Sequence, residues 1–271
     1  MNDIINALMN EMRDQEDLFI GHQIPNLSLA EFEHLLDKFK DILFPGVFKS
    51  KSNHEVNQHM INSLEELKNT LENLLQNKSN SKEDHLVSKI IHLLPSLKKE
   101  LSQDIVAIYD GDPAAKSHEE VLLAYPSFEA IMIYRIAHQL SLLKLDLFAR
   151  ILASIAHRST GIDIHPKAVI GKSFCIDHGT GIVIGETAVI GNNVKMYQGV
   201  TIGALSVSKN QQNEKRHPTI ADNVTIYART TILGGNTIIG KNSIIGGNVW
   251  LTKSIPEGSK IYNKDYKIEH S

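Results

Sequence analysis

The carboxy-terminal part of the chain repeats an aliphatic residue at every sixth position. The inward positions of this repeat fall in three registers: Ile164, Ile170, Ile176 and Ile182; Ile184, Ile190, Met196, Ile202, Ile220, Ile226 and Ile232; Leu233, Ile239, Ile245 and Leu251. An α-helix repeats every 3.6 residues and a strand alternates every two, so neither explains a period of six. Short strands joined by tight turns do, when each six-residue unit forms one side of a three-sided coil. The spacing predicts a parallel β-helix of hexapeptide repeats.

One polar stretch interrupts these coils. Residues 206–219, SVSKNQQNEKRHPT, lack the aliphatic position and lie between two blocks in the same register. We interpret the stretch as a loop extruded from one coil, which is where functional residues often lie on a rigid scaffold.

The amino-terminal part has the periodicity of helices. Ser28 and Glu31 fit a capping box before an apolar stripe that ends at Pro45-Gly46, and a leucine stripe follows in SLEELKNTLENLLQN. Further helices are predicted near 84–110, 116–124, 127–143 and 146–156, and the polar NKSNSKE at 77–83 is predicted to be a linker. We therefore expect an α+β protein, with a helical assembly domain over 1–157 and a β-helix catalytic domain over 158–271.

Composition excludes several classes of partner. The net charge of −3 gives no electrostatic reason to expect binding to nucleic acid or to an anionic membrane. The single cysteine, Cys175, cannot form an intrachain disulfide, the first residues lack the plan of a signal peptide, and no apolar run is long enough to span a membrane. We expect a cytoplasmic protein.

The pair Asp177-His178 stands out within the repeat. A stacked coil has no structural need for an imidazole beside a carboxylate. Imidazole titrates near neutral pH, with an ordinary pKa of about 6.5, and suits general-base catalysis. The pair is therefore a candidate catalytic site.

Five strings in this chain resemble the serine acetyltransferases, the enzymes that begin cysteine synthesis. They are DGDPA at 110–114, YRIAHQL at 134–140, DIHPKAVIG at 163–171, DHGTGIVIGETAVIG at 177–191 and RHP at 216–218. The resemblance implies a left-handed β-helix after a helical domain, assembled as a homotrimer with active sites between subunits, or as a dimer of trimers. It also implies acetyl-CoA as co-substrate and the hydroxyl of L-serine as acceptor, with no metal.

The resemblance also assigns roles to single residues. His178 would be the general base and Asp163 would orient its ring, as an aspartate does in serine hydrolases. Asp112 and Asp177 would contact the ammonium of serine, while Arg216 and His217 would bind its carboxylate.

Gly203, Ala204, Ala228 and Arg229 match the segments that bind the donor. Tyr227 and Arg229 stand where the family often has Gly. The tail departs as well, because many members end in an Ile that docks onto O-acetylserine sulfhydrylase whereas this chain ends in SKIYNKDYKIEHS.

Some of these residues have a structural interpretation too. Asp112 before Pro113 has the form of a helix N-cap, and His138 lies in a helical apolar pattern typical of a packed core histidine. His165-Pro166 is interpreted as a corner of the β-helix, and nothing supports a nucleophilic role for Cys175.

Three other functions are compatible with the sequence. The same fold could acetylate homoserine or another hydroxyl acceptor. A β-helix can also hold zinc through three histidines between subunits, as γ-type carbonic anhydrases do, although His165, His178 and His217 are scattered here. A non-catalytic repeat scaffold would make the Asp–His pair incidental.

Overall fold

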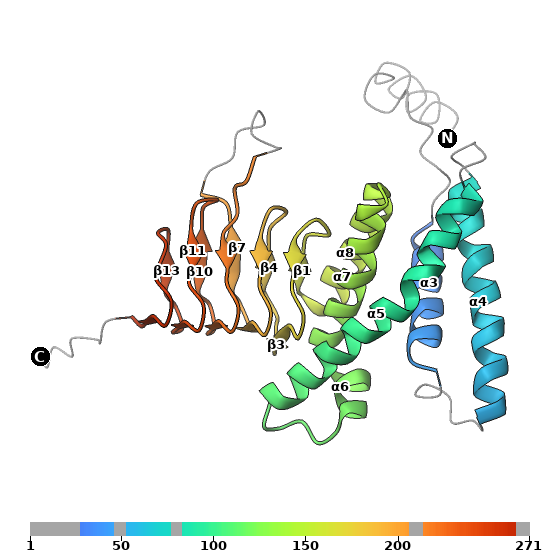
Figure 1. Ribbon diagram of the computed structural model, residues 1–271, viewed down its shortest axis with the longest axis horizontal. Helices are drawn as coiled ribbons and strands as arrows, with labels where there is room; N and C mark the ends of the chain where they lie inside the picture. Colours follow the sequence, from blue (N-terminus) through green and yellow to red (C-terminus); the bar gives the residue numbers. More distant parts are fainter. Residues whose placement is uncertain (1–27, 46–52, 77–82, 206–213, 264–271) are drawn as a thin grey trace, which may run out of the picture.

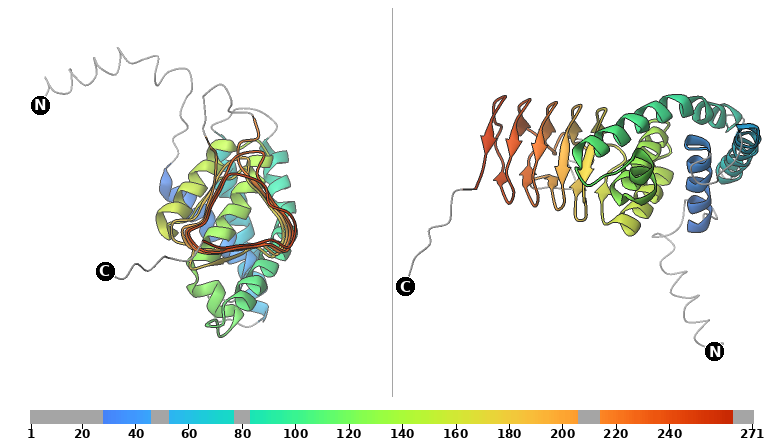
Figure 2. Two further views of the ribbon diagram at one scale, coloured as in Figure 1. Left: turned by 90° about the vertical axis from the view of Figure 1, so that its left-hand side faces the viewer. Right: turned by 90° about the horizontal axis from the view of Figure 1, so that it is seen from below.

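A computed structural model describes residues 28–45, 53–76, 83–205 and 214–263. Residues 77–82 of the predicted linker, the tail after residue 263 and most of the predicted 206–219 loop lie outside these ranges, while Glu83 begins a helix. Helices precede a β-helix whose triangular outline is visible end-on (Figures 1 and 2). The predicted fold class, a helical region followed by a parallel β-helix of hexapeptide repeats, is confirmed.

Six helices are described in the amino-terminal part. Their bounds are α3 Leu29–Leu43, α4 Asn53–Gln76, α5 Glu83–Gly111, α6 His118–Ala124, α7 Pro126–Leu142 and α8 Asp146–Thr160. The predicted capping box is confirmed, because Ser28 accepts a hydrogen bond from the Glu31 amide and Glu31 accepts one from the Ser28 amide. The second helix begins earlier than the leucine stripe indicated. None of the described helices is long and apolar enough to cross a membrane.

The strands are two or three residues long and form three parallel sheets. The first sheet contains β1 Asp163–Ile164, β4 Val183–Ile184, β7 Thr201–Gly203, β10 Thr231–Leu233 and β13 Trp250–Leu251. The second contains β2 Val169–Ile170, β5 Val189–Ile190, β8 Thr219–Ile220 and β11 Ile238–Ile239. The third contains β3 Cys175–Asp177, β6 Lys195–Tyr197, β9 Thr225–Ile226, β12 Ile244–Ile245 and β14 Lys260–Ile261.

The aliphatic residue of each unit lies inside the coil. Ile176, Met196 and Ile226 are register partners in the third sheet, and each is fully buried. Ile239 and Ile245 of the last register are buried as predicted, but Leu233 is not the inward residue of β10: Ile232 is, and it pairs with Ile202.

The change of register after Ile182 has a structural cause. Asp177 pairs with Tyr197, twenty residues on, whereas Val183 pairs with Thr201, eighteen residues on. The corner between β3 and β4 therefore holds two more residues than the corresponding corner of the next coil. His178 lies in this enlarged corner.

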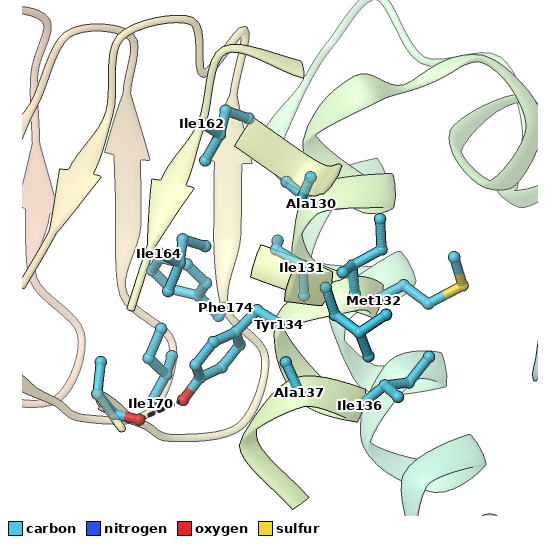
Figure 3. Close-up of a cluster of buried hydrophobic side chains, with 14 of the residues drawn as sticks. Ala130, Ile131, Met132, Tyr134, Ile136, Ala137, Ile162, Ile164, Ile170 and Phe174 are labelled. Carbon is cyan, nitrogen blue, oxygen red and sulfur yellow. Dashed lines mark hydrogen bonds between the residues drawn. The ribbon is translucent and has the colours of Figure 1, made fainter. Parts of the chain in front are cut away.

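The helical region packs directly onto the first coil. Tyr134 and Ile131 of α7 lie against Ile164, Ile170 and Phe174 of the β-helix (Figure 3). The Tyr134 hydroxyl donates to the Ala168 carbonyl over 2.7 Å. α8 ends at Thr160, where Gly161 takes a left-handed conformation (φ +70°), and β1 begins at Asp163.

Candidate active site

The proposed base is presented to solvent by an unusual backbone. His178 follows β3 with φ +60°, in the left-handed region that only a few non-glycine residues occupy. Its side chain is 73% exposed, and its Nε2 atom lies 3.6 Å from Oδ1 of Asp177. The enlarged corner therefore displays the imidazole at the edge between the third and first sheets.

Asp177 is held by a lysine that sequence reasoning missed. Lys195 of β6 places Nζ 3.0 Å from Oδ2 of Asp177 and 4.5 Å from the centre of the Tyr197 ring. The same ammonium donates to the carbonyl of Gly111, the last residue of α5. Nothing in the sequence marks Lys195, since a lysine on an outward strand position is usually a solvated surface residue.

Asp112 is not a helix N-cap, so the structural alternative for this residue is wrong. It follows the end of α5, and the N-cap of α6 is Ser117. The Asp112 carboxylate accepts hydrogen bonds from the Tyr125 hydroxyl at 2.7 Å and from the Ala114 amide at 2.8 Å. Tyr125 and the Ala114 amide lower the pKa of Asp112, and nearby His178 and Lys195 lower it further. The same hydrogen bond raises the pKa of Tyr125 to about 12.

Asp163 lies in β1, half-buried, near this edge. Within the described ranges no hydrogen bond or ion pair joins its carboxylate to His178, whose Nε2 instead faces the Asp177 carboxylate. The arrangement assigned to Asp163 by resemblance remains a prediction.

Arg216 belongs to a second cluster, at the edge between the first and second sheets. Its guanidinium pairs with Glu186, and Lys167 lies 3.7 Å from the same carboxylate. Burial raises the pKa of Glu186, but the hydrogen bond from Arg216 and the charge of His165 outweigh it, so that the pKa is lowered. The group thus presents a planar cation beside a carboxylate that is already ionised.

His217 is fixed by Thr187, another residue that the sequence did not mark. The Thr187 amide donates to Nδ1 of His217 over 3.1 Å, and the Thr187 hydroxyl contacts the same atom at 2.8 Å. The hydroxyl also accepts from the Arg216 and His217 amides. Burial, followed by the charge of Arg216, lowers the pKa of His217 to about 4. Gly185 leaves room for the ring, since a Cβ there would lie 2.0 Å from Nε2 of His217.

The donor-binding candidates divide between the same two edges. Gly203 ends β7 and Ala204 follows it, at the edge of the Arg216 cluster, whereas Ala228 and Arg229 follow β9 at the edge of His178. Arg229 is exposed and has φ +60°. The neighbouring Tyr227 stacks on Tyr197, with ring centroids 4.9 Å apart.

The remaining candidates have structural surroundings. His138 is half-buried, with Nδ1 2.7 Å from the Pro166 carbonyl oxygen, and His165 Nδ1 accepts from the Lys167 amide. Cys175 is buried beneath the end of α5, and this burial raises the pKa of its thiol to about 12. Among the residues that the structure describes, no three His, Cys, Asp or Glu side chains are grouped to hold a metal ion.

Sequence comparison places this chain in a known family. The family model described as "Serine acetyltransferase, N-terminal" matches residues 51–133. A plasmid serine acetyltransferase of Synechococcus elongatus is 52% identical over 181 residues, covering 65% of this chain and 56% of that protein. The serine acetyltransferase of Bacillus pumilus is 44% identical over 163 residues, covering 60% of this chain and 73% of that protein. The match therefore spans little more than half the length of the first relative.

Solved structures agree with the sequence comparison. Serine acetyltransferase isoform 3 of Entamoeba histolytica, crystallised in complex with cysteine, is 37% identical with a TM-score of 0.78, covering 88% of this chain and 83% of that one. A serine acetyltransferase in complex with CoA is 30% identical with a TM-score of 0.58, covering 86% of this chain and 96% of that one. The chain belongs to the serine acetyltransferase family.

Proposed function

We propose that this protein is a serine O-acetyltransferase that transfers the acetyl group of acetyl-CoA to the hydroxyl of L-serine, the first step of cysteine biosynthesis. The observation that carries the proposal is the enlarged corner, which exposes His178 beside two carboxylates, Asp177 and Asp112, in a chain of this family. A scaffold would have no need for the two extra residues or for an exposed imidazole.

The reaction needs no nucleophile from the protein. His178 takes the proton of the serine hydroxyl as its oxygen attacks the thioester carbonyl, and the tetrahedral intermediate then expels the CoA thiolate. The protonated imidazole returns the proton to the sulfur, so that O-acetyl-L-serine and CoA leave. In this proposal Asp163 orients the ring and stabilises its charged form once the acceptor is bound.

The acceptor is a zwitterion, which the two clusters complement in charge. Asp112 and Asp177 supply anionic contacts for the α-ammonium. For the α-carboxylate, Arg216 supplies two parallel guanidinium N–H donors and His217 supplies a ring N–H. Because Nδ1 of His217 accepts from Thr187, its Nε2 carries the proton in the neutral ring. Arg216 also forms an ion pair with Glu186, and this pair holds the guanidinium in place.

The two clusters lie at opposite edges of the first sheet of one chain. We infer that a complete site forms between neighbouring subunits of a homotrimer, where the His178 edge of one subunit meets the Arg216 edge of the next. The same seam would hold acetyl-CoA, along Gly203 and Ala204 on one side and Ala228 and Arg229 on the other. The CoA complex of a relative supports this choice of donor.

The test measures CoA thiol release from acetyl-CoA with L-serine, with L-homoserine and without acceptor. The variant His178→Asn keeps a residue that tolerates the left-handed backbone but removes the imidazole. We expect its serine-dependent rate to fall by a factor of about 100 to 10,000. His157→Asn, at an exposed position in the last turn of α8, serves as the matched control.

Each outcome separates one alternative. Preference for homoserine would keep the mechanism and change the acceptor. Undiminished release by His178→Asn would remove the proposed base. No release by the wild type with either acceptor would contradict the proposed reaction.

A further inference from the structure

We propose that Lys195 is a positioning residue, which fixes Asp112 and Asp177 in the relation that the serine ammonium requires. The inference rests on the proposed function and adds to it a residue that lies outside the matched motifs. The contacts of Lys195 are with Asp177, the Gly111 carbonyl and the Tyr197 ring.

The lysine is held from several sides. An ammonium has three N–H donors. Those of Lys195 face Oδ2 of Asp177 at 3.0 Å and the carbonyl oxygen of Gly111, and the Tyr197 ring lies 4.5 Å from Nζ. Only 18% of the side chain is exposed. Two ionic or hydrogen-bonding partners and one ring leave this lysine far less freedom than a surface lysine has.

The Gly111 contact joins the helical region to the β-helix. The last four carbonyls of an α-helix lack partners inside the helix and carry the negative end of its dipole, so a cation there is stabilising. Lys195, on strand β6, supplies this cation to the end of α5. The helix end also packs tightly on β3, since a Cβ at Gly111 would lie 2.8 Å from Sγ of Cys175. Asp112 is the next residue, so this anchor sets where its carboxylate can reach.

The Asp177 contact orients the second carboxylate. With Oδ2 engaged by Lys195, Oδ1 is the oxygen that faces His178. Only 11% of the Asp177 side chain is exposed, and without Lys195 this carboxylate would lose its cationic partner in a partly desolvated place. One lysine thus controls both anionic groups, one through the backbone and one through its side chain.

Removing the lysine has two opposing effects, one electrostatic and one geometric. It leaves an additional uncompensated negative charge, which alone would attract the serine ammonium more strongly. It also releases the end of α5 and the Asp177 carboxylate. We expect the loss of placement to dominate, because the ammonium must contact both carboxylates at hydrogen-bonding distance.

The experiment compares Lys195→Met with Lys195→Arg in the full-length protein. For Lys195→Met we expect the KM for L-serine to rise about tenfold, while kcat and the KM for acetyl-CoA change by less than about threefold. Lys195→Arg retains the charge and donors and should recover most of the loss. Lys241→Met is the control, because Lys241 pairs with Asp222 at 3.4 Å on a different edge of the β-helix. The melting temperature of each variant identifies any that fail to fold.

The results distinguish this inference from the proposed function. If the wild type releases no CoA with serine, the proposed function fails and the inference fails with it. If the wild type is active but Lys195→Met has an unchanged or lower KM for serine, the inference alone is overturned. A uniform loss of kcat in both Met and Arg variants would also overturn it, because that pattern indicates a general structural role.

Discussion

Arg135 and Asp104 form a buried, two-contact ion pair where the helices meet the first coil of the β-helix. Nε of Arg135 lies 3.0 Å from Oδ2 of Asp104, and Nη2 of Arg135 lies 3.1 Å from Oδ1. The same guanidinium donates to the Ile170 and Gly171 carbonyls, and Asp104 accepts from the Phe174 amide. The pair therefore satisfies backbone groups of β2 and of the corner before β3, as well as its own charges.

Breaking this pair should cost much of the stability of the fold. We expect Arg135→Met to lower the free energy of unfolding by about 3–5 kcal/mol, because Asp104 would stay buried without a cation. Arg158→Met removes an exposed pair with Glu33 at 3.6 Å and should cost at most about 1 kcal/mol. Denaturant unfolding of both variants checks the difference. Adding Asp104→Leu to Arg135→Met should restore only part of the loss, since the Ile170, Gly171 and Phe174 backbone groups remain without their partners.

The hydroxyl of Thr187 should matter for serine binding because it holds the backbone of Arg216 and His217. Thr187→Val keeps the shape of the side chain but removes the acceptor of two amide hydrogen bonds. We expect the KM for serine to rise about tenfold, since a buried N–H left unpaired costs about 1–3 kcal/mol and the loop end would shift. Thr187→Ser retains the hydroxyl and should remain close to the wild type. Equal losses in Val and Ser would contradict this expectation, because Ser keeps the hydroxyl that accepts the two amide hydrogen bonds and Val does not.

Tyr125 should affect the ammonium side of the site in the same manner. Tyr125→Phe removes the 2.7 Å hydrogen bond to Asp112 and leaves the ring in place. We expect the KM for serine to rise by a factor of about 3 to 10, with a smaller change in kcat. The reason is that the Asp112 carboxylate loses one hydrogen bond from a neutral donor. Tyr109→Phe is a suitable control, since the Tyr109 ring contacts His118 rather than a site carboxylate. Steady-state kinetics at varied serine would contradict the expectation if both variants behaved alike.

Acid should destabilise the folded protein partly through His217. Burial and the charge of Arg216 lower its pKa to about 4 in the folded chain, whereas an unfolded histidine has a pKa of about 6.5. Between these values the unfolded chain binds more protons, so this contribution is complete above pH 6.5 and is lost as the pH falls toward 4. Replacing His217 by Gln should reduce the loss of stability between pH 6.5 and 4.5 by about 1–2 kcal/mol. His157→Gln, at an exposed position in α8, is the matched histidine control.

The sequence predicts the fold better than it predicts the contacts within the site. The capping box at Ser28 and the six-residue aliphatic repeat are local patterns, which can be recognised in a single sequence. The contacts of Lys195 with Gly111 and of Thr187 with His217 join residues 84 and 30 positions apart. These contacts depend on where α5 ends relative to the third sheet and on where the β-helix resumes after the loop. The sequence alone leaves a cap and a binding role open for Asp112, because Tyr125 reaches it only in the folded chain.

Arg229 offers a test of the proposed donor site, where this chain departs from the family pattern. It occupies a left-handed corner position, and Asn248 has the same conformation one coil further on. Arg229→Asn therefore keeps a residue that tolerates this backbone and removes only the long cationic side chain. If the guanidinium contacts the phosphates of CoA, the KM for acetyl-CoA should rise about three- to thirtyfold, with the KM for serine unchanged. The rise should shrink at high ionic strength, because salt already weakens the wild-type contact. An unchanged KM for acetyl-CoA at low salt would show that the arginine is a corner residue and does not bind the donor.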